Sequence, residues 1–92
     1  MNSYTAETND CGTTRYYLNG KLHRDCDLPA VIYSDGHVEY YKDGELHRDD
    51  GPAIIIGDGT IYYYQNGKRH RDGDLPAVIY ANGDVEYYQN GK

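Results

Sequence analysis

The sequence contains no phenylalanine and no tryptophan, only one methionine, and only two cysteines. Leucine, isoleucine and valine together supply fifteen of its 92 residues, and fifteen acidic against nine basic side chains give a net charge of -6. So few aliphatic residues at that charge are typical of disordered chains. Twelve tyrosines and eleven glycines argue against disorder, and the length is sufficient for one small domain.

Several protein classes are excluded by what is missing. No apolar run approaches the eighteen residues of a transmembrane helix, and no basic-plus-apolar N-terminal segment indicates secretion. We therefore expect a cytoplasmic protein whose Cys11 and Cys26 are reduced, incidental thiols. An acidic chain is a poor binder of nucleic acid or anionic lipid, so neither is expected as a direct partner.

Internal repetition organises almost the whole chain. Three units of 24, 23 and 24 residues span 16–39, 40–62 and 63–86, and the first and third are identical at 18 of 24 positions. Partial copies occupy 9–15 and 87–92, which leaves a leader, 1–8, that we expect to be mobile. Unit two is one residue shorter between Arg48 and Pro52, which predicts a loop there because a deletion would flip the faces of a strand.

Within each unit the local signals are those of β-hairpins. Asn-Gly or Asp-Gly pairs, which suit tight turns, alternate with short β-branched and aromatic runs. Pro29, Pro52 and Pro76 each precede such a run, where proline starts a strand without losing a ladder hydrogen bond. The prediction is an all-β repeat protein of stacked hairpins in a single-layer sheet or solenoid.

Strand alternation assigns residues to the two sides of this sheet. Val38 and Tyr40 share one side, while Glu39 and Tyr41 share the other, and the pattern recurs in the other units. We expect the Val/Ile side to form the core and the second tyrosine of each pair to be partly exposed.

The repeated residues resemble a known family. The stretch Asn66-Gly-Lys-Arg-His70, followed by Tyr80-Ala-Asn-Gly-Asp-Val85 and Tyr88-Gln-Asn-Gly91, is similar to the MORN repeat. The chain departs from the common pattern by lacking the Tyr-x-Gly-x-aromatic glycine and by having His-Arg-Asp where His-Gly-x-Gly is usual. This resembles the divergent His-Arg-Asp-x-Gly-Pro-Ala variety of bacterial, phage and giant-virus proteins. The resemblance implies stacked hairpins with a scaffolding or binding role, without chemistry.

The motif most suggestive of chemistry is His-Arg-Asp, which occurs at 23–25, 47–49 and 70–72. Equivalent residues of successive units would lie on the order of 10 Å apart, too far for one shared zinc ion. The other elements of a kinase catalytic loop are absent. We expect histidine to occupy a fixed structural position, and arginine and aspartate to pair within or between repeats.

No other pattern indicates catalysis or a cofactor. Adjacent carboxylates such as Asp49 and Asp50 do not follow the spacing of a calcium loop, and turn-forming aspartate is the better interpretation. No Ser-His-Asp arrangement or Gly-x-Gly-x-x-Gly motif is present. We expect a protein that is not an enzyme and has no cofactor and no metal.

What remains is a binding surface. Tyrosine is favoured at protein interfaces, and a recurring tyrosine stripe flanked by turn aspartates is the predicted protein-binding face. Its predicted residues are Tyr17, Tyr33, Tyr41, Tyr64, Tyr80, Tyr88, Asp35, Asp43 and Asp58. The expected partner is a protein, and a basic surface on it would suit the charge of this chain.

Two alternatives stay open from the sequence. A small acidic phage or viral protein can inhibit a host nuclease, or another enzyme that binds nucleic acid, by occupying its basic channel. The final partial repeat at 87–92 also leaves an open edge strand, through which homodimers or a self-assembling structural or virion component would form.

Overall fold

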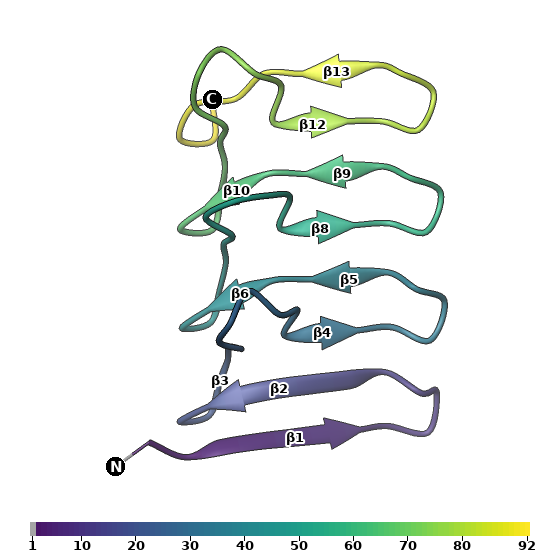
Figure 1. Ribbon diagram of the computed structural model, residues 1–92, viewed down its shortest axis with the longest axis vertical. Helices are drawn as coiled ribbons and strands as arrows, with labels where there is room; N and C mark the ends of the chain where they lie inside the picture. Colours follow the sequence, from purple (N-terminus) through teal and green to yellow (C-terminus); the bar gives the residue numbers. More distant parts are fainter. Residues whose placement is uncertain (1) are drawn as a thin grey trace.

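The computed structural model describes residues 2–92 as a single layer of antiparallel hairpins, with no helix among them (Figure 1). The main sheet is nine-stranded and open, and its strands follow one another in the order β1-β2-β4-β5-β8-β9-β12-β13, with β3 beside β2. Its strands are β1 (Tyr4–Thr8), β2 (Thr14–Leu18), β3 (Lys21–Leu22), β4 (Val31–Ile32), β5 (Val38–Glu39), β8 (Ile54–Ile55), β9 (Ile61–Tyr62), β12 (Val78–Ile79) and β13 (Val85–Glu86). The predicted all-β class and hairpin architecture are confirmed.

Two short hairpins continue the repeats beyond one end of the strands of the main sheet. They are β6 (Tyr41–Lys42) with β7 (Glu45–Leu46), and β10 (Tyr64–Gln65) with β11 (Lys68–Arg69). The β2–β3 pair is their counterpart in the first repeat. These hairpins stack on one another: the Gly44 N–H donates to the Leu22 carbonyl at 2.9 Å and the Gly67 N–H to the Leu46 carbonyl at 2.8 Å.

The turns explain why Asn-Gly and Asp-Gly recur. At the tips of the short hairpins both turn residues have positive φ, as in Asn66 (51°) and Gly67 (80°). This is the conformation of a type I′ turn, which asparagine, aspartate and glycine tolerate best. In the turns at the other end of these strands, only the glycine has a positive φ, as in Gly36 (φ 95°). There the Asp35 carboxylate accepts the His37 N–H at 3.0 Å, so aspartate closes the turn with its side chain.

The registers of the main sheet align two continuous rows of side chains, because directly paired residues of antiparallel strands point to the same side. One row runs Arg15, Val31, Glu39, Ile54, Tyr62, Val78, Glu86. The other row runs Thr14, Ile32, Val38, Ile55, Ile61, Ile79, Val85. The first row lies on the side of the second tyrosines, here called the tyrosine side.

The prediction of which side of the sheet forms the core is wrong. Val31 and Val78 are the largest fully buried side chains, and both lie on the tyrosine side. On the predicted core side, Val38 and Ile61 are half-buried and Val85 is 43% exposed. The physical reason is that, within residues 2–92, no second sheet or helix covers the aliphatic row. Tyrosine rings flank the valines on the other side, where Tyr62 is paired with Val78 in register.

The leader, residues 1–8, contains a strand that the sequence did not indicate. Residues 4–8 form β1, which pairs along its full length with β2. All five residues are exposed, so the strand has no core pattern that the sequence could reveal. Backbone hydrogen bonding to β2 places it, and the Tyr4 hydroxyl donates to the Asp25 carboxylate at 2.7 Å. β1 thereby occupies the position that β4, β8 and β12 have in the later repeats (Figure 1).

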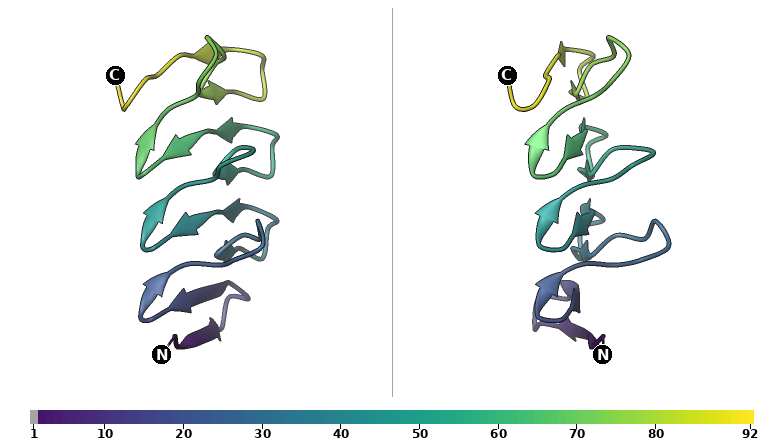
Figure 2. Two further views of the ribbon diagram at one scale, coloured as in Figure 1. Left: turned by 60° about the vertical axis from the view of Figure 1, so that its left-hand side comes forward. Right: turned by 90° about the vertical axis from the view of Figure 1, so that its left-hand side faces the viewer.

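The sheet has structurally different projections on its two sides (Figure 2). The tips of the short hairpins bend to one side, while the His-Arg-Asp loops, residues 23–28, 47–51 and 70–75, bulge to the other. The side toward which these loops bulge is here called the loop side. Tyr40 lies on it, with the Arg48 guanidinium carbon 3.9 Å from the centroid of its ring. Residues 2–92 contain no helix that is long and apolar enough to cross a membrane.

Candidate functional site

Each His-Arg-Asp histidine fastens one repeat to the next. In His47, Nε2 lies 2.6 Å from the Asp49 carboxylate, while Nδ1 lies 3.0 Å from the backbone nitrogen of Asn66 in the following turn. His23 repeats the arrangement with Asp25 and Asp43, and His70 repeats it with Asp72 and Asn90. The predicted fixed position of histidine is confirmed.

These contacts determine the protonation state that suits the ring. A backbone N–H can only donate, so Nδ1 of His47 must be the acceptor, and Nε2–H then donates to Asp49. Both ring nitrogens are engaged, and neither is left to act as a base or metal ligand. Among residues 2–92, no three His, Cys, Asp or Glu side chains gather closely enough to hold a metal ion.

The arginine of each motif lies over the ring of the first tyrosine of its repeat. Guanidinium carbons lie 3.7 to 3.9 Å from the ring centroids in the pairs Arg24–Tyr16, Arg48–Tyr40 and Arg71–Tyr63. In each repeat, one terminal nitrogen also donates to the carbonyl of the proline that starts the next strand, at 3.2 or 3.3 Å. The arginines are half-buried, and the alanines of the Pro-Ala steps, Ala30, Ala53 and Ala77, are fully buried.

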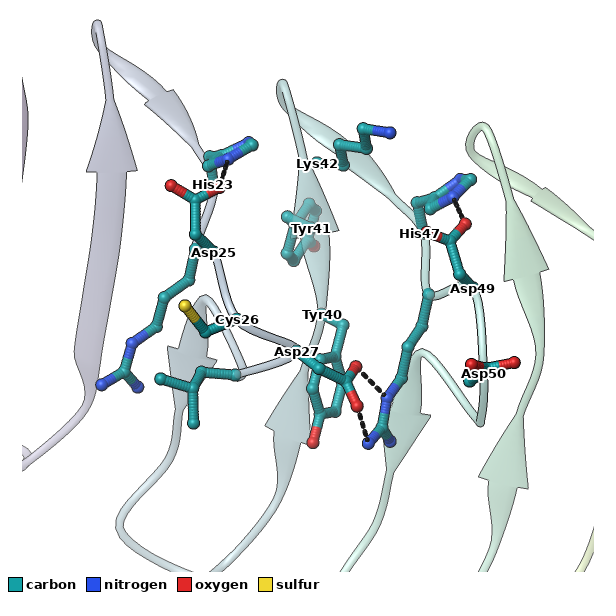
Figure 3. A pocket seen from close by; sticks show the side chains of 13 residues that line it. His23, Asp25, Cys26, Asp27, Tyr40, Tyr41, Lys42, His47, Asp49 and Asp50 are labelled. Atoms are coloured by element: carbon teal, nitrogen blue, oxygen red, sulfur yellow. Dashed lines mark hydrogen bonds and ion pairs between the residues drawn. The ribbon is translucent and has the colours of Figure 1, made fainter. Parts of the chain in front are cut away.

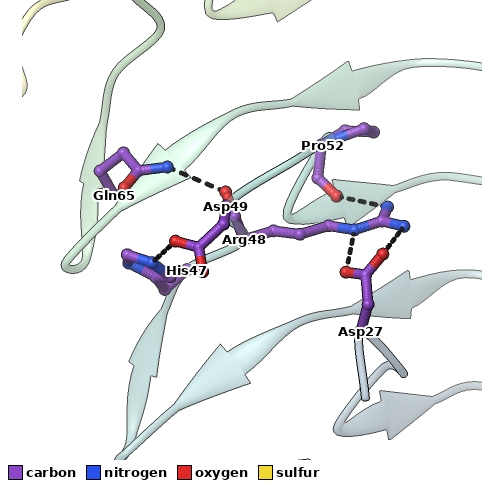
Figure 4. Close-up of polar contacts among 6 residues, drawn as sticks. All are labelled: Asp27, His47, Arg48, Asp49, Pro52 and Gln65. Carbon is purple, nitrogen blue, oxygen red and sulfur yellow. Dashed lines mark hydrogen bonds and ion pairs between the residues drawn. The ribbon is translucent and has the colours of Figure 1, made fainter. Parts of the chain in front are cut away.

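A groove runs between the first and second loops (Figure 3). Across it the Asp27 carboxylate holds the Arg48 guanidinium through two contacts, 2.8 Å to Nε and 3.1 Å to Nη2 (Figure 4). These hydrogen bonds hold the pKa of Asp27 below its ordinary value and raise that of Arg48. The predicted pairing of the motif arginine with the motif aspartate is wrong in the described residues: Asp49 contacts His47, and Arg48 binds Asp27, which lies outside the motif. Gln65 adds a further link by donating to the Arg48 carbonyl at 2.9 Å.

The six predicted tyrosines share the other side of the sheet. Tyr17, Tyr41, Tyr64 and Tyr88 follow the strand alternation of the buried-valine row, and all six are half-buried. The Tyr41 hydroxyl donates to Glu39 at 3.0 Å. Burial, followed by the charge of Glu39, raises the pKa of Tyr41 to about 12.

Arg69 is a member of the tyrosine side that sequence reasoning missed. Its guanidinium donates to the Tyr64 hydroxyl at 3.4 Å and the Tyr88 hydroxyl at 3.2 Å, and Glu86 lies 3.7 Å away. The Tyr64 hydrogen bond is the main reason that its pKa is raised further. The register gives the missed signal, because the positions equivalent to Arg69 are Leu22 and Leu46 in the other units.

The three predicted aspartates do not join the tyrosines. Asp35 and Asp58 lie in the turns at one end of the main-sheet strands. Each caps its own turn, Asp58 by accepting the Thr60 N–H at 2.8 Å. Asp43 lies in a hairpin tip beyond the other end of the strands, with its carboxylate 3.5 Å from Nδ1 of His23. The structure thus brings together the tyrosines and separates them from these aspartates.

No protein-family model, curated protein or solved structure matches this chain.

Proposed function

We propose that the chain is a MORN-like, non-enzymatic protein-binding module that contacts its partner through the tyrosine side of the sheet. The supporting observation is the half-buried tyrosine row, in which the hydroxyls of Tyr41, Tyr64 and Tyr88 are already hydrogen-bonded to Glu39, Glu86 or Arg69. Tyrosines held in this way offer large contact area with little ordering cost on binding.

Arg69 supports a partner that supplies basic side chains. It lies 5.4 Å from the Tyr62 ring and 5.2 Å from the Tyr88 ring while facing Glu86, which is the set of contacts that a partner's arginine would seek. One repeat earlier, Tyr41 and Glu39 form the same pair, but the equivalent of Arg69 is Leu46. That position offers a tyrosine and a carboxylate without an arginine, and the nitrogen closest to Glu39 is Nε2 of His37 at 3.3 Å. The net charge of -6 favours the same kind of partner.

The test begins with affinity capture from the native host and identification of the captured protein by mass spectrometry. Its affinity is then measured for the native chain and for the Tyr41→Ala/Tyr64→Ala double variant. We expect a loss of at least about tenfold, because truncated interface tyrosines commonly cost more than ~1 kcal/mol each. Val85→Thr, on the opposite side, is the matched control and leaves the affinity unchanged. Equal affinity of the double variant and the native chain removes the tyrosine side from the interface.

Salt dependence separates this function from inhibition by nucleic-acid mimicry. An interface centred on tyrosine rings keeps most of its affinity between low and moderate salt. A mimic that occupies a phosphate channel through many acidic contacts weakens steeply over the same range. A steep salt dependence that is insensitive to the tyrosine substitutions would favour the inhibitor.

A further inference from the structure

The arginines of the three His-Arg-Asp loops, Arg24, Arg48 and Arg71, can be compared with one another. Each has the same two fixed contacts, a tyrosine ring beneath the guanidinium and a proline carbonyl at one terminal nitrogen. These contacts fix the plane and direction of the guanidinium before any further partner binds. A guanidinium oriented in this way is suited to bidentate recognition of a carboxylate.

Arg48 shows what completes such a site. Its Nε and Nη2 both bind the carboxylate of Asp27, which comes from the loop of the preceding repeat. The contact is made at the surface, since the Asp27 side chain is 57% exposed while that of Arg48 is 16% exposed. An acidic side chain therefore enters this groove from the solvent side and meets a guanidinium already in place.

The corresponding carboxylate is missing in front of Arg71. The first loop reads Asp25-Cys-Asp-Leu-Pro29, but the second, Asp49-Asp-Gly-Pro52, is one residue shorter and has no equivalent of Asp27. Within residues 2–92, the side-chain partners of Arg71 are the Pro76 carbonyl at 3.2 Å and the Tyr63 ring at 3.9 Å. Four of the five guanidinium donors are left for solvent or a ligand.

The groove is present although its carboxylate is not. Asp50, Gly51, Tyr63 and Arg71 are among the residues that line the space between the second and third loops. Arg24 also lines a groove, but the opposite wall of that groove is β1, with Tyr4 and Thr5, and not a preceding His-Arg-Asp loop. Arg71 is thus the one loop arginine that faces a preceding loop but receives no carboxylate from it, within the part of the chain that the structure describes.

We propose that the groove at Arg71 binds an aspartate or glutamate side chain of a partner protein, with the carboxylate on Nε and Nη2 of Arg71 as Asp27 lies on Arg48. Asp49, Asp50 and Asp72 also line this groove. Asp49 and Asp72 accept from histidines, and a comparable acidic lining around Arg48 does not prevent its binding of Asp27. The acidic lining selects a carboxylate that is flanked by lysine or arginine. This contact lies on the loop side and is separate from the tyrosine interface.

The test uses the full chain and a defined probe, the peptide acetyl-Lys-Asp-Lys-amide, with acetyl-Lys-Asn-Lys-amide as the uncharged match. Site-resolved NMR follows the Nε–H signals of the arginines during each titration. The Arg71 signal is expected to shift saturably with the aspartate peptide and at least about tenfold less with the asparagine peptide, while Arg48 stays in place. An unmoved Arg71 signal, or equal responses to the two peptides, overturns the proposal.

Two variants test whether Arg48 and Arg71 bind a carboxylate in the same way. Asp27→Asn removes the carboxylate from Arg48, so the Arg48 signal should then respond to the aspartate peptide as Arg71 does. Arg71→Lys keeps the charge but loses the two-donor fork, and the binding detected through backbone signals of the groove should weaken about tenfold. Undiminished binding to Arg71→Lys would contradict the bidentate site. Because no captured partner is used, failure here is distinguishable from failure of the tyrosine interface.

Discussion

The Asp27 carboxylate bridges two repeats by holding Nε and Nη2 of Arg48 at 2.8 and 3.1 Å. Arg48 in turn lies on Tyr40 and donates to Pro52, so one ion pair connects the loop of one repeat to the strands of the next. With the histidine contacts, this makes the His-Arg-Asp loops a fastening between neighbours. Stability in such an array is approximately a sum over repeats and their interfaces, so a single loop substitution should have a local, measurable cost.

Replacing one fastening histidine should destabilise the protein. His47→Ala removes the acceptor of the Asn66 N–H and the donor to Asp49, and we expect a loss of ~1–2 kcal/mol in the free energy of unfolding. Urea denaturation measures the change. Lys42→Ala, an exposed substitution on the neighbouring strand β6, serves as the control with a change within about 0.5 kcal/mol. Equal midpoints for the two variants would show that the histidine does not fasten the repeats.

Acid should weaken the same network. Hydrogen bonds from Arg48 and His47 hold the pKa values of Asp27 and Asp49 below their ordinary value. The folded protein then binds fewer protons than the unfolded chain, so this stability is present above about pH 4 and is lost as pH falls through the folded pKa values. The difference in stability between the native chain and Asp27→Asn should shrink between neutral and strongly acid pH. A difference independent of pH would exclude the ion pair as its source.

Alkali should act through Tyr41. Its pKa of about 12 means that the folded protein keeps a proton that the unfolded chain releases near pH 10. Stability therefore declines as pH rises from about 10 to 12. Site-resolved NMR titration of the tyrosine rings should show a late transition that Tyr41→Phe removes. Tyr87→Phe, at a tyrosine that is 62% exposed, should leave the late transition in place. Its loss in that control variant would mean that the transition does not belong to Tyr41.

The position of the core predicts a contrast between two valines. Val78 is fully buried on the tyrosine side, whereas Val85 is 43% exposed on the aliphatic side. Val78→Ala should cost ~2 kcal/mol through lost burial and the cavity left behind, and Val85→Ala less than about 0.5 kcal/mol. Thermal or urea unfolding compares them directly. Similar costs would mean that both sides of the sheet are equally covered in solution.

The sequence predicts the architecture because its main signals are local and repeated. The Asn-Gly turn at residues 66–67 and the strand that follows Pro76 are determined by backbone preferences of neighbouring residues, which a sequence displays directly. Repetition then extends each local prediction along the chain. The tyrosine stripe could be predicted for the same reason, since strand alternation alone places Tyr41 and Tyr64 on one side.

The features that could not be predicted depend on which side of the sheet is covered by other side chains and on backbone hydrogen bonding between strands. Val38 and Val78 carry the same side chain, but the registers place them on opposite sides of the sheet, where Val38 is half-buried and Val78, beside Tyr62, is fully buried. β1 has no apolar pattern and is placed by its hydrogen bonds to β2. The Asp27–Arg48 pair depends on the distance between two loops, and a one-residue deletion removes it from the next groove without changing the repeat pattern around it.

The most direct test of this account is the tautomer of the three motif histidines, read from ¹⁵N NMR shifts of the ring nitrogens at neutral pH. The account predicts that His23, His47 and His70 each carry the proton on Nε2, with Nδ1 as an acceptor from Asp43, Asn66 and Asn90 respectively. Replacing one of them by alanine should speed exchange of the matching turn amide alone. Histidines that average between tautomers, or that carry the proton on Nδ1, would contradict a structural His-Arg-Asp ladder.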